Sequence, residues 1–347
     1  MSTPPHTPTA APRAYKRATL RTISELTGLS QSMVSLSLRG GTSLKEETRL
    51  KVAEAAARVG YVPDRAGVRL RTGKTNVLAL VLDGEEDSID FSRHLIQGIG
   101  QAIKGTRYHM TVMPEFDRTH SVDSILYILE NRSADGVIIT HTSARDPRVQ
   151  LMMDHNFPFV THGRTEFYMP HAFHDFHSEE FARLAVERLA AKDCKNVTLI
   201  IGGDSTYNYH TIVTSFERAA ARVGLKTRVA AHPTNRTAAS AQVMRQFGRD
   251  LASGTDRPDG IICDSEMRSI CMIMGMQDQG LMVGKDFQFI CKQTSDVLST
   301  LYPSIDTIEE DVFAAGTELS RLLLRRIAGE APERLQTLGE PTAHWRD

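Results

Sequence analysis

The chain has 347 residues, 41% of them hydrophobic, and no run approaches the roughly 20 apolar residues of a membrane span, so a membrane partner is not expected. Its formal net charge of −1 is unevenly distributed: residues 1–75 carry thirteen Lys or Arg and five acidic residues, a net of +8, which leaves −9 for the remainder. A basic head on an acidic body favours a nucleic-acid-binding module attached to another domain.

Residues 1–18 are rich in Pro, Thr and Ala and lack the apolar stretch of a secretory signal. We expect them to form a disordered arm whose basic end adds phosphate contacts.

Residues 19–40 predict two short helices joined by a tight turn. Gly28 breaks the first helix, and Ser30 can cap the second. A glycine in a three-residue turn between short amphipathic helices is typical of a helix-turn-helix, whose second helix presents its first residues to base edges in the major groove. Here those residues are Gln31 and Ser32, which can donate and accept hydrogen bonds. Taken alone, the segment fits an ordinary helical hairpin equally well.

A third helix is expected over residues 48–59, introduced by a capping box of Ser43 and Glu46. Its apolar face comprises Leu50, Val52, Ala53, Ala56 and Ala57. A short basic helix over residues 65–74 follows, with Asp64 as its cap. These elements are enough for a compact DNA-binding head.

Several motifs occur together in this head. They are Thr19-Leu20, Gly28-Leu29-Ser30, Val34-Ser35, Thr48-Arg49, Val52, Gly60-Tyr61-Val62-Pro63, and Leu70 before Arg71-Thr72-Gly73-Lys74. With this set, the run resembles the head and hinge of the lactose-repressor (LacI/GalR) family of bacterial transcription regulators. The resemblance implies that Gln31 and Ser32 read bases, and that Leu70 wedges between base pairs in the minor groove at the centre of a pseudo-palindromic, double-stranded operator.

Two positions depart from the family's usual V-S-R-V-L-N run, because Leu36 and Arg39 stand where Arg and Asn are usual. Base readout is therefore altered, and Leu36 either meets a thymine methyl group or packs. The residues expected to contact DNA are Thr19, Leu20, Ser30, Gln31, Ser32, Ser35, Leu36, Arg39, Arg65, Arg69 and Leu70.

From residue 76, short apolar runs alternate with helical patterns. The expected strands lie at 77–82, 110–113, 134–140, 158–161, 172–176, 197–203, 226–231, 260–264 and 287–291. Strands joined through helices form parallel, doubly wound sheets, and about 270 residues exceed one core. We therefore expect two lobes, with a ligand in the cleft beyond the carboxyl ends of the strands.

Looser motifs follow in this body, among them Asp135-Gly136-Val137-Ile138 and Pro258-Asp259-Gly260-Ile261. They resemble the same family and the sugar-binding periplasmic proteins. The fold class is thus an N-terminal all-α helix-turn-helix head plus an α/β body of two doubly wound parallel-sheet lobes, periplasmic-binding-protein-like. The implied domains are 19–63 for the helix-turn-helix, 64–75 for hinge helix and linker, 76–174 with 304–329 for the N-terminal lobe, 175–303 for the C-terminal lobe, and 330–347 for a tail.

The expected effector site departs most from the family. Ile212 stands where an arginine is usual, and Lys292-Gln293-Thr294 replaces an acidic run, so the charged clamp for sugar hydroxyls is largely replaced. The residues expected to line the site are His162, Arg164, Tyr207, His210, Asp264 and Gln293. Such neutral and cationic groups suit a sugar or a polar, even anionic, sugar derivative.

Neither a metal nor a catalytic site is indicated. His171, His174 and His177 recur at every third residue, but they lie in a predicted strand, where His174 and His177 point to opposite sides. No H-E-x-x-H, G-x-S-x-G or Walker glycine loop occurs, and no cofactor is expected.

The four cysteines form no C-x-x-C pair and are expected to be buried, reduced thiols of a cytoplasmic protein.

These features together predict a cytoplasmic, effector-responsive DNA-binding transcription regulator, a repressor of a carbohydrate uptake or catabolic operon. One alternative is a periplasmic-type solute-binding receptor without DNA function, which the basic head opposes. Another is an enzyme on a doubly wound fold, which the missing nucleophile and base oppose. The tail contains no leucine heptads, so a homodimer rather than a tetramer is expected.

Overall fold

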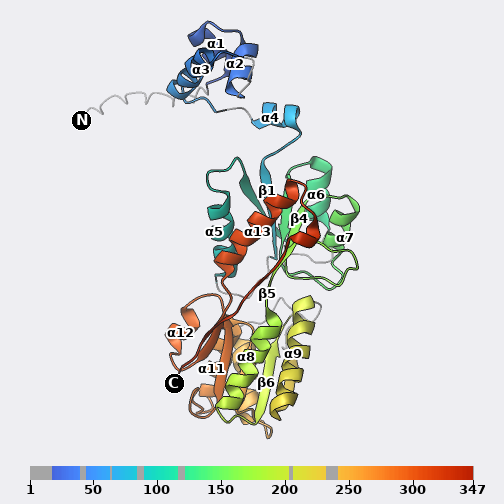
Figure 1. The fold of residues 1–347 in the computed structure, drawn as a ribbon. Coiled ribbons are helices and arrows are strands. Elements are labelled where there is room, and N and C mark those ends of the chain that lie inside the picture. Colours follow the sequence, from blue (N-terminus) through green and yellow to red (C-terminus); the bar gives the residue numbers. More distant parts are fainter. Residues whose placement is uncertain are drawn as a thin grey trace, which may run out of the picture. The chain divides into compact units, whose positions relative to one another are not determined.

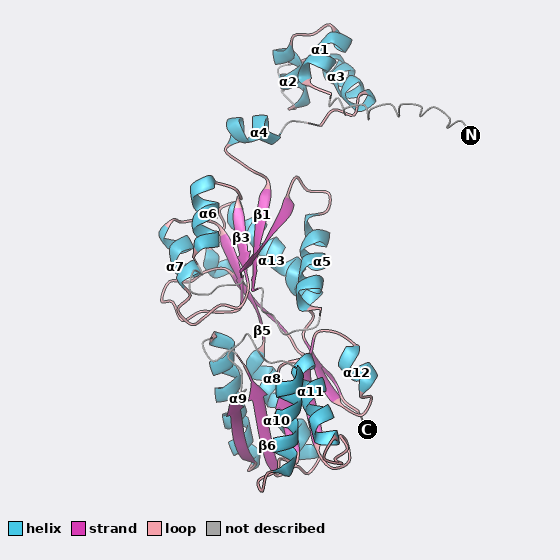
Figure 2. Ribbon diagram, turned by 180° about the vertical axis from the view of Figure 1, so that it is seen from behind, coloured by secondary structure: helices cyan, strands magenta, loops and turns pink. Residues whose placement is uncertain are grey.

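The computed structural model describes residues 18–39, 44–62, 65–83, 90–115, 122–202, 206–231 and 241–346. The chain divides into two compact units, Met1–Thr75 and Asn76–Asp347, each with its own hydrophobic core (Figures 1 and 2). The predicted arm lies outside the described residues apart from Ala18.

The first unit contains α1 (Leu20–Thr27), α2 (Gln31–Leu38), α3 (Glu46–Arg58) and α4 (Arg65–Thr72). Thr19 caps α1, and Gly28 ends it at φ 72°, a left-handed conformation that glycine adopts without a Cβ clash. Ile23, Val34 and Val52, one from each of the first three helices, are fully buried together. This packing completes the helix-turn-helix.

The structure differs from the expected apolar face of α3. Val52 and Ala56 are buried together with Ala55, whereas Leu50 is 57% exposed. Because α3 packs on only two short helices, fewer of its apolar residues are buried than the sequence pattern predicts. Lys45 stands at the N-cap without a side-chain hydrogen bond, and the predicted caps Ser43 and Asp64 lie outside the described residues.

The second unit consists of two lobes, each built on a six-stranded sheet. The first sheet contains β1 (Val77–Asp83), β2 (His109–Glu115), β3 (Gly136–Ile139), β4 (Phe159–His162), β5 (Phe173–Phe176) and β11 (Gln336–Gly339), in the spatial order β11-β5-β4-β3-β1-β2 with all neighbours parallel. The second sheet contains β6 (Asn196–Ile201), β7 (Lys226–Ala231), β8 (Gly260–Cys263), β9 (Gln288–Gln293), β10 (Asp306–Glu309) and β12 (Thr342–His344), in the order β12-β10-β9-β8-β6-β7. Its neighbours are parallel except β12, which runs antiparallel to β10. The predicted fold class is confirmed.

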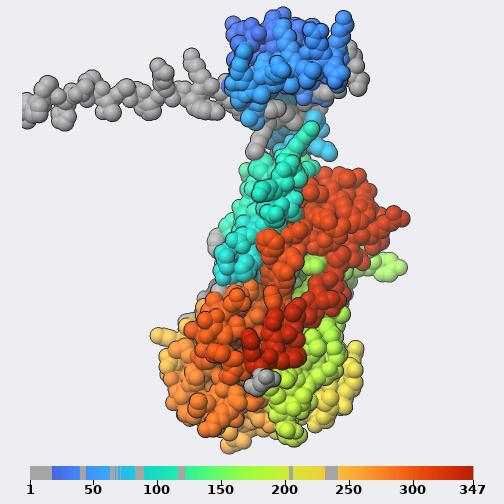
Figure 3. Space-filling view, turned by 60° about the vertical axis from the view of Figure 1, so that its left-hand side comes forward, coloured from blue at the N-terminus to red at the C-terminus, as the bar shows by residue number. Residues whose placement is uncertain are grey.

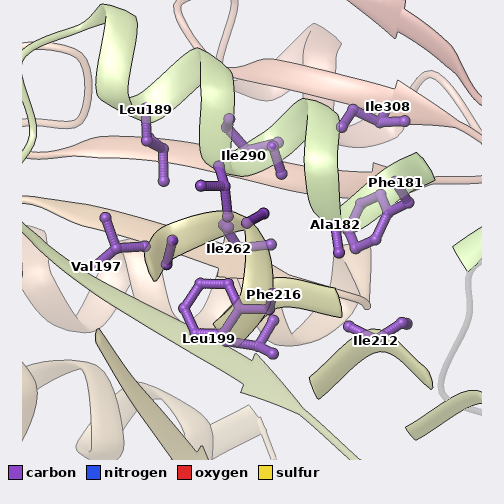
Figure 4. Close-up of a cluster of buried hydrophobic side chains, with 14 of the residues drawn as sticks. Phe181, Ala182, Leu189, Val197, Leu199, Ile212, Phe216, Ile262, Ile290 and Ile308 are labelled. Carbon is purple, nitrogen blue, oxygen red and sulfur yellow. The ribbon is translucent and has the colours of Figure 1, made fainter. Parts of the chain in front are cut away.

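Helices cover both faces of each sheet. The first sheet packs against α5 (Phe91–Ile103) and α13 (Val312–Ile327) on one face and against α6 (Asp123–Asn131) and α7 (Pro147–Asp154) on the other. The second sheet packs against α8 (Ser178–Ala191) and α9 (Tyr207–Val223), and on its other face against α10 (Ala241–Ser253) and α11 (Glu266–Gln277). Figure 4 shows Phe181 of α8 and Phe216 of α9 in one buried cluster with Ile262 of β8. The short helices α12 (Val297–Leu301) and η2 (Pro332–Arg334) complete the unit.

The chain crosses between the lobes after β5, after β10 and after β11. The expected boundaries differ here: β10, assigned to the N-terminal lobe with residues 304–329, pairs with β9 in the second sheet. Residues 330–347, expected as a tail, contribute β11 to the first sheet and β12 to the second, and this red segment runs over the surface in Figure 3. A strand of three or four residues carries no periodicity that could show which sheet it joins.

Among the described residues, no helix combines the length and apolarity needed to cross a membrane. In the same ranges no three His, Cys, Asp or Glu side chains gather in a way that could hold a metal ion. All four cysteines are free and buried, and burial raises the pKa of Cys263 to about 11.

Candidate DNA-reading head and ligand cleft

The first turn of α2 presents polar side chains to solvent. Gln31 and Ser32 are exposed, and the Ser30 hydroxyl caps the helix by accepting a hydrogen bond from the backbone N–H of Met33 at 3.3 Å. The partial positive charge of a helix N-terminus attracts phosphate, and short polar side chains there can reach base edges. This end of α2 therefore has the chemistry of a DNA-reading surface.

Of the other residues of this head that were predicted to contact DNA, some are exposed and others pack against the core. Thr19 is exposed, whereas Leu20 packs against the core of the three helices. Ser35 and Leu36 are half-buried. Arg39 is exposed, and its Nε donates to the backbone carbonyl of Ser35 at 2.8 Å, so the guanidinium folds back over the end of α2.

The basic helix α4 presents an apolar side chain to solvent. Leu70 is 90% exposed, and the neighbouring Arg69 is exposed as well. The side chain of Arg65 lies outside the described part of the chain. A single exposed leucine is common on protein surfaces. Here the exposed leucine lies directly beside an exposed arginine on a basic helix.

A cavity of about 520 Å³, called the ligand cleft below, lies between the lobes of the second unit. The first lobe contributes the start of α5 and the second lobe the segment after β9 and the end of β10. The lining residues are Asp90, Arg93, His94, Gln293, Thr294, Ser295, Asp296, Val297, Thr300, Leu301 and Glu309. This volume lies within the range of small-molecule sites, about 300–1,000 Å³.

A buried carboxylate, that of Glu266, binds two lining residues of the ligand cleft. Glu266, at the start of α11, accepts hydrogen bonds from the backbone N–H of Thr294 at 3.1 Å and from its hydroxyl at 3.0 Å. The hydroxyl of Ser295 donates to the same carboxylate at 2.8 Å. Burial raises the pKa of Glu266, and these donors oppose the rise. These hydrogen bonds connect the segment after β9 to the start of α11.

The six residues predicted to line an effector site do not come together in one site. Gln293 alone lines the ligand cleft. Tyr207 and Asp264 bind arginines of the body: Tyr207 lies under Arg164, 5.0 Å from ring centre to Cζ, and Asp264 accepts from Arg268 at 2.9 Å. His210 is exposed on α9. The remaining two, His162 and Arg164, belong to the charged groups between the lobes.

Three charged side chains meet at the crossing after β10. Glu310 lies 2.7 Å from Lys292 Nζ and 3.1 Å from His162 Nε2, and all three are nearly excluded from solvent. Burial alone would lower the pKa values of His162 and Lys292, but the Glu310 carboxylate outweighs it and raises both. Conversely, burial alone would raise the pKa of Glu310, but the two cations hold it far below its usual range. Glu310 thus joins β4 of the first lobe to β9 of the second.

Arg164 makes a second connection between the lobes. Its Nε donates to Asp175 of β5 at 2.7 Å, and its two Nη atoms donate to Glu179 of α8 at 3.0 and 2.9 Å. Burial opposes the charged guanidinium, yet the two carboxylates raise its pKa. The planar fork of arginine suits such paired recognition. Arg164 is therefore held by protein carboxylates rather than presented to a ligand.

Sequence reasoning missed the charged partners Glu310 and Asp175 and the cleft residues of α5. One signal was available, since Lys292 and Asp175 interrupt apolar strands where a charge needs a partner. No signal could pair Arg93 with Gln293, because 200 residues separate them and only the packing of two lobes brings both to one cavity.

An exposed helix-turn-helix joined to a two-lobed body with a ligand cleft defines a DNA-binding regulator with a sensory domain. A family model described as a periplasmic binding protein-like domain matches residues 186–347. The transcriptional regulator AglR of Rhizobium meliloti (strain 1021) is 27% identical over 327 residues, which cover 90% of each chain.

Two solved structures share the fold. The lac repressor dimer bound to operator and the anti-inducer ONPF has a TM-score of 0.80 at 18% identity and covers 94% of this chain and 98% of its own. The complex of the transcriptional regulator CelR with cellobiose has a TM-score of 0.69 at 20% identity and covers 95% and 99%. The chain is thus similar, in sequence and in fold, to transcriptional regulators of the lactose-repressor (LacI/GalR) family.

Proposed function

We propose that this protein is a transcriptional repressor of a carbohydrate uptake or catabolism operon, switched by a sugar-like effector bound between its lobes. The observation that carries the proposal is the exposed first turn of α2, with Gln31 and Ser32, on a unit of net charge +8. CelR, a regulator of the same fold, binds cellobiose. Because the target is chromosomal DNA, the proposed site of action is the cytoplasm.

In the proposed mechanism, a homodimer places two copies of α2 in successive major grooves of a pseudo-palindrome. Thr19, Ser30, Arg39, Arg65 and Arg69 supply backbone or base contacts, and Leu70 enters the minor groove, where the cost of unstacking is offset by the contacts of a bent duplex. An effector that binds one arrangement of the lobes better than the other shifts the population of DNA-binding dimers.

The test is recovery of genomic DNA fragments by the purified full chain, repeated with individual sugars, sugar phosphates and sugar acids. We expect one enriched palindrome whose recovery changes with one compound, and the direction of change shows whether that compound releases or recruits the repressor. A Gln31→Ala, Ser32→Ala double variant is the matched control and should lose the enrichment. If the unaltered protein enriches no sequence, the proposed function is wrong.

Two further parts of the proposal have their own tests. A homodimer predicts a mass of two chains by analytical ultracentrifugation, and four chains would contradict it. The protein is proposed not to be an enzyme, so sugar phosphates incubated with it should be recovered unchanged. Turnover, or ligand binding without any DNA binding, would favour the enzyme or the solute-receptor alternative.

A further inference from the structure

The outward face of the helix α2 carries apolar side chains. Val34 and Ser37 of this helix are buried. Side chains three or four positions apart share one face of a helix, so Leu36 lies on the same side as Ser32 and Met33. Ser32 is exposed, Met33 is 38% exposed and Leu36 is half-buried. The face of α2 that is turned away from the core is therefore partly apolar.

Met33 and Leu36 lie outside the core of the head. The partly buried apolar residues that pack against this core are Leu20, Leu29, Leu38, Val59 and Tyr61. Neither Met33 nor Leu36 is among the described residues that form this cluster. Single exposed apolar residues are common on protein surfaces, but these two are neighbours on the helix whose first turn presents Gln31 and Ser32 to solvent. Their apolar surface is available to the partner that this helix meets.

The polar side chains of α2 include no reader for guanine. The helix has the sequence QSMVSLSL, which contains no Arg, Lys or Asn. Arg and Lys are the usual partners of guanine O6 and N7, whereas Gln pairs with adenine and Ser contacts several bases. Arg39, directly after the helix, has its Nε committed to the backbone carbonyl of Ser35 at 2.8 Å. Base selectivity beyond that of Gln31 therefore has to come from another kind of contact.

The major groove offers one apolar group to such a helix. It is the C5-methyl group of thymine, and 5-methylcytosine carries the same group. Side chains at positions i and i+3 of a helix lie about 5–6 Å apart at their Cβ atoms, so Met33 and Leu36 can contact the methyl groups of neighbouring base pairs. Such a contact removes apolar surface from water, and each methyl group buried in this way strengthens binding about fourfold.

We propose that Met33 and Leu36 select each half of the operator palindrome, called a half-site below, by contact with thymine methyl groups beside the base pair that Gln31 reads. This inference rests on the proposed function, because it specifies how the head of that regulator recognises its operator. It predicts half-sites in which A·T pairs, rather than G·C pairs, face α2.

The test uses the palindrome recovered from genomic DNA, made as a synthetic duplex and titrated with the purified full chain in fluorescence anisotropy. Each thymine of the half-sites is replaced in turn by deoxyuridine, which lacks only the C5-methyl group. We expect one or two positions at which the replacement weakens binding about fourfold per half-site, while thymines outside the half-sites show no effect. Synthetic DNA contains no 5-methylcytosine, so specific binding to it identifies thymine as the source of the methyl group.

Variants of the protein assign the methyl contacts to side chains. Met33→Ala and Leu36→Ala should each weaken binding to the thymine duplex and abolish the effect of deoxyuridine at one of the sensitive positions. Leu50→Ala is the matched control, because Leu50 is an exposed apolar residue of the same unit but belongs to α3. It should keep both the affinity and the full effect of deoxyuridine.

Three results would overturn the inference while the palindrome is still bound specifically, which leaves the proposed function intact. The first is a change in affinity of less than about twofold on deoxyuridine replacement at every thymine of the half-sites. The second is a recovered half-site without thymine, or one that is bound only when its cytosines are methylated. The third is a full deoxyuridine effect in both alanine variants. If no palindrome is enriched at all, the proposed function is wrong and this inference with it.

Discussion

Replacing Glu310 by glutamine tests whether buried charges hold the two lobes together. The substitution keeps the size of the side chain but leaves the ammonium of Lys292, 2.7 Å away, and the imidazole of His162, 3.1 Å away, without their carboxylate. Removing one partner of a buried pair costs about 3–5 kcal/mol because an uncompensated charge remains. Asp175 also lies near enough to interact with both cations, so we expect the lower end, about 3 kcal/mol.

The assay is urea denaturation of the full chain at pH 7, followed by far-ultraviolet circular dichroism. Glu340→Gln is the control, because its partner His177 lies at the surface and exposed pairs contribute about 0–1 kcal/mol. A Lys292→Met, Glu310→Leu double variant, which removes both charges, should recover most of the lost stability. The reasoning is contradicted if the free energy of unfolding of Glu310→Gln lies within about 1 kcal/mol of that of the unaltered protein. It is also contradicted if the double variant is less stable than Glu310→Gln.

Three further predictions concern pH and DNA. Burial lowers the pKa of His174 to about 4 from 6.5, so the unfolded chain takes up a proton that the folded chain refuses between these values. The free energy of unfolding should therefore fall by about 3 kcal/mol as the pH drops from 6.5 to 4, and His174→Asn should abolish that share of the loss in the same urea assay. Gln31→Ala should weaken operator binding by about 1–3 kcal/mol in fluorescence anisotropy while non-specific binding stays the same, and an equal loss on both DNAs would contradict base reading. Leu70→Ala should likewise weaken specific binding more than non-specific binding, and equal losses would remove the wedge assignment.

The sequence predicted those parts of the fold that local patterns determine. Gly28 and Ser30 mark the turn and cap of the helix-turn-helix, and the apolar runs of the body locate nine of its strands. The cap, the turn and the alternation of strand and helix all depend on residues that are close together in the sequence, so they can be predicted from the sequence alone.

The ligand cleft could be predicted only in part, since it depends on contacts between distant segments. Gln293 follows the predicted strand 287–291 and could be proposed from its position alone. Arg164 follows a strand in the same way, yet the carboxylates of Asp175 and Glu179 occupy its guanidinium. Nothing in the local pattern indicates whether a polar side chain at a strand end meets a ligand or another side chain.

The two connections between the lobes constrain how a ligand could switch the protein. Arg164 and Glu310 already join the lobes by ion pairs beside the crossings, so a ligand need not supply all the energy of closure. The ligand cleft joins the start of α5 to the segment after β9. Helix α5 packs so closely on α13 that a Cβ at Gly98 would lie 2.1 Å from the carbonyl oxygen of Phe313. We therefore expect a ligand that displaces the start of α5 to move α13 with it. The first strand of that lobe, β1, begins five residues after the last residue of α4, so in the proposed mechanism this movement reaches the DNA through a short covalent link.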